Sequence, residues 1–353
     1  MKTLQSLNTG QRVNMIERLR IPFTLTKTQI FVLLGLFLLS TYSLFIGQHV
    51  SGSLSDLLSN LLSGTLFDPL QSVVIWQWRA PRICAAIFIG GALGVSGAIF
   101  QSLVKNPLGS PDITGFNVGA FTGVLLTMAF IGVHFWLVVI GAIGGGLFAA
   151  MLVYLFAYRD GMSGFRLIIV GIAVSAMLSA FNMWLSLSVS LETAMTAALW
   201  SVGSLNGITW AKLIPISLFL GILLVFSAML VTRMKLLEMG DDLAAALGVS
   251  VHKTRLLLML IGVCLTAAPT AITGPIAFIS LAAPQIAKRL NLSKQNSKKC
   301  SLFSAALVGA FLLVTADYLA QYALPETKFP VGLVTISLGG VYLVYLISNE
   351  SKN

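Results

Sequence analysis

The feature that most constrains this sequence is a series of ten apolar stretches, most of them long enough to cross a lipid bilayer. A transmembrane helix needs about 20 apolar residues. Charged residues make up only 10% of the 353 residues, against about 25% in soluble domains. We therefore predict an all-α integral membrane protein with ten transmembrane helices. The stretches cover roughly 30–47, 82–104, 113–133, 135–157, 167–189, 211–232, 253–272, 275–290, 301–322 and 331–348.

Two short breaks and two mixed segments interrupt this pattern. Thr273-Gly274-Pro275 separates the seventh and eighth stretches, because glycine and proline together end a helix. A tight turn near Gly132 separates the third from the fourth. We expect 48–81 to form a short surface helix on the outer side. The segment 190–210 is too polar to span, so we expect it at the membrane surface or partway in, packed on protein.

The basic residues predict the orientation. With residues 1–29 as a basic cytoplasmic tail and an uncleaved first helix, ten crossings return residues 349–353 to the cytoplasm. Eighteen of the 22 Lys and Arg residues then fall inside. Such an excess is the positive-inside signal of membrane proteins. Four lie outside: Arg79, Arg82, Lys212 and Lys328.

Several motifs of other functions are absent from the sequence. It has no G-x-x-x-x-G-K-[ST] loop, so it does not bind a nucleotide in the P-loop manner, and it shows no catalytic constellation. The three cysteines and three histidines are scattered, so we expect no metal site. Asp317 is the only carboxylate within a predicted span. Ion-coupled carriers usually need such groups near the midplane, so the energy is expected to come from another chain.

Several long motifs identify a resemblance. They are WRAPR at 78–82, QSLVKNPLGSPD at 101–112, LEMGDDLAAALGV at 237–249, GPIAFISLAAPQIAKR at 274–289, and AD at 316–317 followed by FPVGLVT at 329–335. In this order and spacing, they resemble the iron-siderophore and vitamin B12 permease family of ABC importers. A faint likeness between residues 97–99 and 274–276 is compatible with a five-plus-five repeat.

The resemblance implies the type II permease architecture, a single ten-helix domain over 30–348. It also implies a second, non-identical permease subunit, two cytoplasmic ATPase subunits that use ATP and Mg, and a periplasmic binding protein. The chain itself is then not an enzyme and binds no cofactor. The expected cargo is a ferric siderophore of the catecholate, enterobactin type, carried across a bacterial inner membrane by alternating access. A vitamin B12 or haem permease and an ion-gradient carrier stay open as alternatives.

The resemblance also assigns roles to three groups of residues. Binding-protein docking falls on Arg79 and Arg82, with Lys328 as a further cation because Gln321 stands where the family often has an arginine. ATPase coupling falls on the segment 237–249, with Leu237, Glu238, Asp241, Asp242, Ala245, Ala246, Leu247 and Gly248. Its acids suit the start of a short helix, and Gly248 can end it.

The translocation path is the third group. The resemblance points to the fifth and tenth spans, where the polar residues are Ser175, Ser179, Asn182, Ser186, Thr335 and Ser337. Each of them is equally suited to hydrogen bonding between helices.

Overall fold

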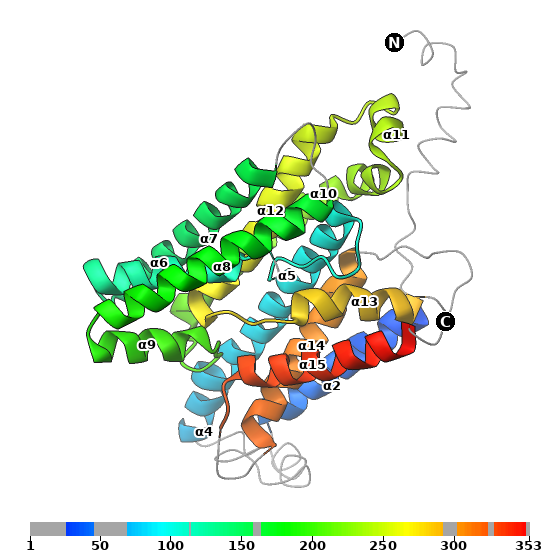
Figure 1. Ribbon diagram of the computed structural model, residues 1–353. Coiled ribbons are helices and arrows are strands. Elements are labelled where there is room, and N and C mark those ends of the chain that lie inside the picture. Colours follow the sequence, from blue (N-terminus) through cyan, green and yellow to red (C-terminus); the bar gives the residue numbers. More distant parts are fainter. Residues whose placement is uncertain are drawn as a thin grey trace.

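The computed structural model describes residues 26–45, 69–112, 114–157, 164–291, 302–323 and 328–350, and the regular structure within these ranges is helical. Figure 1 shows the helices packed as one bundle. Their bounds are α2 Lys27–Phe45, α4 Pro69–Val73, η1 Val74–Arg79, α5 Ala80–Val104, α6 Phe116–Phe130, α7 Phe135–Ala157, α8 Gly164–Ser188, α9 Leu191–Ser201, α10 Trp210–Glu238, α11 Asp241–Ala246, α12 Val251–Thr273, α13 Ile279–Asn291, α14 Leu302–Tyr322 and α15 Val331–Glu350.

Helix α5 forms the centre of the bundle, in contact with α10, α12, α13 and α14. Most of its residues are buried. Glycines bring its backbone against its neighbours: a Cβ on Gly90 would clash with the Gly309 carbonyl of α14, and one on Gly97 would clash with the Ser280 carbonyl of α13. Small residues are common where membrane helices approach closely. Gly91 differs, because a Cβ there would make only ordinary contact, 3.6 Å from the Ala306 carbonyl.

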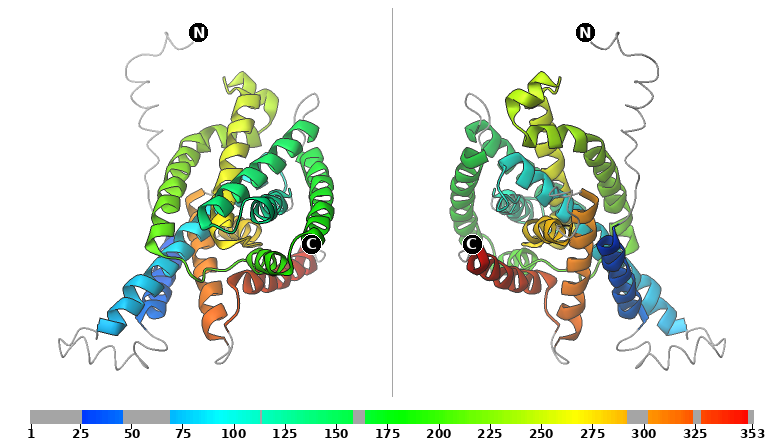
Figure 2. Two further views of the ribbon diagram at one scale, coloured as in Figure 1. Left: turned by 90° about the vertical axis from the view of Figure 1, so that its left-hand side faces the viewer. Right: turned by 90° about the vertical axis from the view of Figure 1, so that its right-hand side faces the viewer.

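The bundle has two distinct ends, which Figure 2 shows with α11 at the top and α4 at the bottom. At the α11 end, the C-terminus of α5 meets the N-terminus of α8, where Gly164 lies against the Val104 carbonyl. At the opposite end, Arg82 near the start of α5 is paired with Asp317 near the end of α14. We call these the α11 end and the Arg82 end.

Seven helices in the described ranges are long and apolar enough to cross a membrane. Each of the ten predicted stretches contains a helix, but α6 with 15 residues and α13 with 13 are shorter than the about 20 residues of a full span. The chain is therefore a multi-pass helical membrane protein, and the count of ten crossings stays a prediction.

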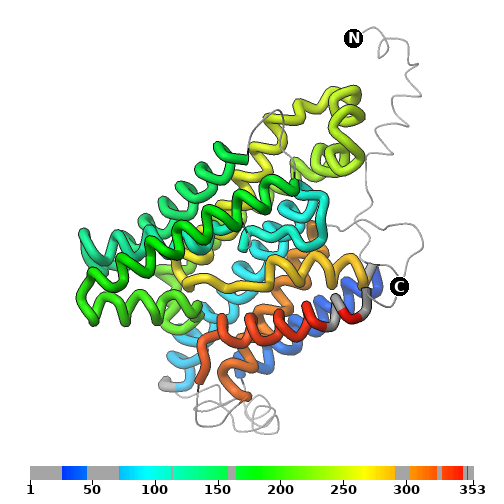
Figure 3. The backbone as a smooth tube through the Cα atoms, viewed as in Figure 1, coloured from blue at the N-terminus to red at the C-terminus, as the bar shows by residue number. Residues whose placement is uncertain are grey.

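The predicted breaks are confirmed. Helix α12 ends at Thr273, and Gly274 adopts the positive φ of 72° that the turn requires. Figure 3 shows the chain turning back at this point before α13 begins. Helices α6 and α7 are joined through Gly132, whose φ is 133°.

The two mixed segments came out differently. Within the described part of 48–81, residues 71–79 form no separate surface helix but continue into α5 as one helix, Gln71–Val104. One face of this helical stretch packs on the protein through buried Ile75, while Trp76 and Trp78 are exposed. Residues 46–68 lie outside the described residues. The segment 190–210 contains α9, which packs on α6 through Phe121 and Trp200 and so fits the prediction of a short segment packed on protein.

Candidate functional site

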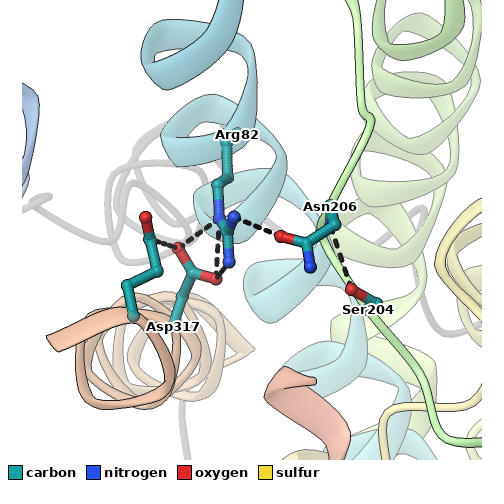
Figure 4. A network of polar contacts seen from close by, with 5 residues as sticks. Arg82, Ser204, Asn206 and Asp317 are labelled. Carbon is teal, nitrogen blue, oxygen red and sulfur yellow. Dashed lines mark hydrogen bonds and ion pairs between the residues drawn. The ribbon is translucent and has the colours of Figure 1, made fainter. Parts of the chain in front are cut away.

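At the Arg82 end, a polar network joins three parts of the chain (Figure 4). Arg82 donates from Nε to both carboxylate oxygens of Asp317 at 3.0 Å and from Nη2 to Oδ1 at 2.8 Å. Its Nη1 donates to Asn206 Oδ1, and Gln321 Nε2 donates to Asp317 Oδ2 at 2.7 Å. The Asp317 side chain is 3% exposed and that of Arg82 15%. The network therefore ties α5, α14 and the connection before α10.

The three predicted docking cations share this end, but they are engaged differently. Arg79, at the end of η1, donates to the Leu44 carbonyl at 3.2 Å. Lys328 is exposed and lies just before α15. Lys212, the fourth cation predicted outside, donates to the Gly207 carbonyl at 3.2 Å and lies 4.5 Å from the centre of the Phe135 ring. The docking role of Arg79, Arg82 and Lys328 stays a prediction, and Arg82 already has a carboxylate partner within the chain.

At the α11 end, the predicted coupling segment forms a short exposed helix. Asp241 and Asp242 occupy the first turn of α11, as expected, and Gly248 follows its end with a φ of 83°. Leu237 is buried beneath it. Glu238 does not start this helix, because it is the last residue of α10 and Gly240, with a φ of 125°, separates the two helices.

Apolar side chains in and beside α11 are exposed, next to the exposed Asp242. Leu243 is 44% exposed and Leu247 58%, next to Met239 at 58%. Ala245 and Ala246 are exposed as well, while Ala244 faces the protein. A cluster of exposed apolar side chains is typical of a contact with another protein or with lipid. The sequence motif contained these residues but did not show which of them point outward.

Asp241 holds α11 in place. Its Oδ1 lies 2.6 Å from Nη2 of Arg255 on α12 and 3.5 Å from Nζ of Lys105, the residue that caps α5. Neither cation was singled out from the sequence for this role, because they are 14 and 136 residues away from Asp241.

Three of the six predicted path residues come together. Ser179, Asn182 and Ser186 of α8 line a pocket of about 340 Å³ with residues of α6, with Ser201 and with Pro275. Asn182 donates from Nδ2 to the Val118 carbonyl at 3.3 Å, and its buried Oδ1 has no partner among the described residues.

The other three path residues bond within their own helices. Ser175 donates to the Gly171 carbonyl, Thr335 to Gly332 and Ser337 to Leu333. They do not line this pocket. The path role of all six residues stays a prediction.

A further polar site was missed. Asp112, in the connection between α5 and α6, accepts hydrogen bonds from Ser280 Oγ at 2.6 Å, Phe278 N at 3.3 Å and Asn117 Nδ2 at 2.7 Å. It thus caps the start of α13 from a distant part of the chain. Asp112 lies at the end of a quoted motif, but only the fold shows its partners.

Comparison with known proteins finds transport-system permeases among those similar to this chain. The ferric enterobactin transport system permease protein FepG of Escherichia coli (strain K12) is 51% identical over 304 residues, which cover 86% of this chain and 91% of that protein. The iron(3+)-hydroxamate import system permease protein FhuG of Bacillus subtilis (strain 168) is 35% identical over 294 residues, 80% of this chain and 85% of its own length.

A solved structure and a family model point to the same kind of protein as these relatives. A solved structure of a metal-chelate type ABC transporter in an inward-facing conformation superposes with a TM-score of 0.80 at 26% identity, covering 92% of this chain and 99% of that chain. The sequence model of the FecCD transport family matches residues 33–349. This match spans the network at the Arg82 end, α11 and the pocket beside α8. The chain therefore belongs to the FecCD transport family.

Proposed function

We propose that this chain is a permease subunit of an ATP-binding-cassette importer that carries a ferric siderophore of the enterobactin type across a bacterial inner membrane. The observation that carries this proposal is the 51% identity to a ferric enterobactin permease along 86% of the chain. The energy comes from hydrolysis of ATP, which two partner ATPase subunits bind together with Mg, because this sequence contains no P-loop. A second, non-identical permease completes the path between the two subunits.

The α11 end is proposed as the ATPase contact and as the cytoplasmic side. The exposed Leu243 and Leu247 offer a compact apolar surface to a groove on the partner. Basic residues gather at this end, as the positive-inside rule expects of a cytoplasmic face. They include Lys105, Arg233, Lys235, Lys253, Arg255, Lys288 and Arg289.

The Arg82 end is proposed as the face that receives the periplasmic binding protein. Arg79 and Lys328 lie here, and cations at a rim speed the encounter with an acidic partner. Both chain termini then lie in the cytoplasm, as ten crossings require.

The test is uptake of radioactive iron by cells that lack this chain, supplied in turn with ferric enterobactin, a ferric hydroxamate and labelled vitamin B12. We expect loss of enterobactin uptake alone, restored by the intact gene. Loss of a different cargo with intact enterobactin uptake would overturn the substrate. Uptake that collapses with the proton gradient while ATP stays high would overturn the ATP-driven mechanism.

A further inference from the structure

The short helix α11 packs on the bundle through buried Ala244, and one carboxylate adds ion pairs to two other parts of it. Asp241 is the first residue of α11, and its Oδ1 contacts Arg255 Nη2 at 2.6 Å and Lys105 Nζ at 3.5 Å. Asp242 shares the first turn and is exposed, and it makes no ion pair within the part of the chain that the structure describes. Both acids lie in the first turn, where a negative charge stabilises the helix dipole. The contact with two other helices therefore distinguishes Asp241.

Arg255 needs this partner more than a surface cation would. Its side chain is only 8% exposed, so its charge is largely withdrawn from water. A withdrawn charge is costly unless it is paired, and a charge-assisted hydrogen bond is the strong way to pair it. Arg255 lies one turn into α12, which packs on α5, α7 and α10. The bond from Arg255 to Asp241 therefore links α11 to α12.

Lys105 connects the same carboxylate to α5. It is the C-terminal cap of α5, in the left-handed conformation with a φ of 54°, which turns the chain away from the helix axis. Its Nζ still reaches Asp241 across 136 residues of sequence. Helix α5 is the buried centre of the bundle, and near its other end Arg82 is paired with Asp317. One helix thus carries an ion pair close to each end, about 35 Å apart at 1.5 Å per residue.

We propose that Arg255 and Lys105 are positioning residues for energy coupling. Through Asp241 they hold α11 at a fixed place and pass its displacement to α12 and α5. This inference rests on the proposed function of α11 as the ATPase contact. It separates two roles within the segment 237–249: the outward apolar face binds the partner, and Asp241 transmits its movement.

The test uses the complete importer in proteoliposomes, with the binding protein and ferric enterobactin carrying radioactive iron. Iron transported and ATP hydrolysed are measured together. Arg255→Gln and Asp241→Asn should bind the ATPase normally but transport about tenfold less iron per ATP, equal to about 1.4 kcal/mol. The double variant Asp241→Arg with Arg255→Asp should recover part of this ratio, because the pair is restored in reverse. The matched control is Lys253→Gln, an exposed cation two residues before Arg255, which should leave the ratio unchanged.

A separate arm tests the proposed function itself. Leu247→Asp places a charge on the outer face and should release the ATPase from the purified complex. If Leu247→Asp releases the ATPase while Arg255→Gln and Asp241→Asn keep the normal ratio of iron to ATP, the positioning role is refuted and the ATPase contact stands. If Leu247→Asp leaves the complex and transport intact, α11 is not the contact, and the positioning role fails with it. If a single variant unfolds at a lower temperature in the purified complex, the reversed pair Asp241→Arg with Arg255→Asp decides instead. Failure of this pair to recover any transport per ATP would also refute the positioning role.

Discussion

Removal of the Asp317 carboxylate is expected to destabilise the bundle strongly. Asp317→Ala leaves the Arg82 guanidinium, 15% exposed, without the three hydrogen bonds it makes to the two carboxylate oxygens. Breaking a buried ion pair by deleting one partner costs about 3–5 kcal/mol. Asn206 still accepts from Nη1, and Arg82 keeps some contact with water. We therefore expect a loss near the lower limit, about 3 kcal/mol in the free energy of unfolding.

The measurement is unfolding of the purified permease in mixed micelles with increasing denaturing detergent. Asp317→Asn is the matched control, because it keeps one acceptor oxygen and should lose about 1–2 kcal/mol. The double variant Arg82→Leu with Asp317→Leu removes both charges, so it should lose less than the two single leucine variants added together. The reasoning would be refuted by an Asp317→Ala loss below about 1 kcal/mol, or by leucine variants whose losses simply add.

Three further predictions concern backbone contacts and the missed carboxylate. Gly97→Val should prevent stable folding or cost at least about 3 kcal/mol in the free energy of unfolding, because its Cβ meets the Ser280 carbonyl, whereas Gly91→Ala should change it by less than about 1 kcal/mol. Detergent unfolding and the yield of protein in the membrane measure both variants. Equal losses for the two would contradict the packing described for α5. Asp112→Ala should cost about 2–3 kcal/mol in the free energy of unfolding, because it leaves the donors at the start of α13 without an acceptor. Faster proteolysis between α12 and α13 would show this loss, and unchanged cleavage would count against the cap. Gly248→Ala should cost about 1 kcal/mol through its φ of 83° alone, because nothing lies within 4 Å of the added Cβ, and a loss above about 3 kcal/mol would show a contact that this geometry lacks.

The helices and their breaks were predictable because they depend on local properties of the chain. Apolar length marks the helices, and Gly274 with Pro275 marks the end of α12. The error at 71–79 has the same origin. Polar and aromatic residues such as Gln77 and Trp78 make this stretch less apolar than a typical span. The helix nevertheless runs through it into α5, with Ile75 buried. Assignment of Glu238 to the start of α11 failed because Gly240 sets the boundary two residues later.

The polar partners were not predictable, because they depend on contacts between distant residues. Asp317 was visible as a carboxylate inside a span, but Arg82 lies 235 residues away. Arg82 was interpreted as a contact for another protein, and the fold shows that its guanidinium is already paired. The same limit hid Lys105 and Arg255 behind Asp241. A charge in an apolar helix predicts that a partner exists, but it does not say which residue supplies it.

The Asp112 cap has a consequence for the order of membrane insertion. Asp112 leaves the ribosome 166 residues before Phe278 and 168 before Ser280, which supply two of its donors. Until those residues arrive, the first half of the chain carries a carboxylate with an unfinished set of hydrogen bonds. We therefore expect the region around Asp112 to stay hydrated and loosely packed until then. Arrival of α13 completes the set, so the second half of the chain is needed to finish the packing of the first.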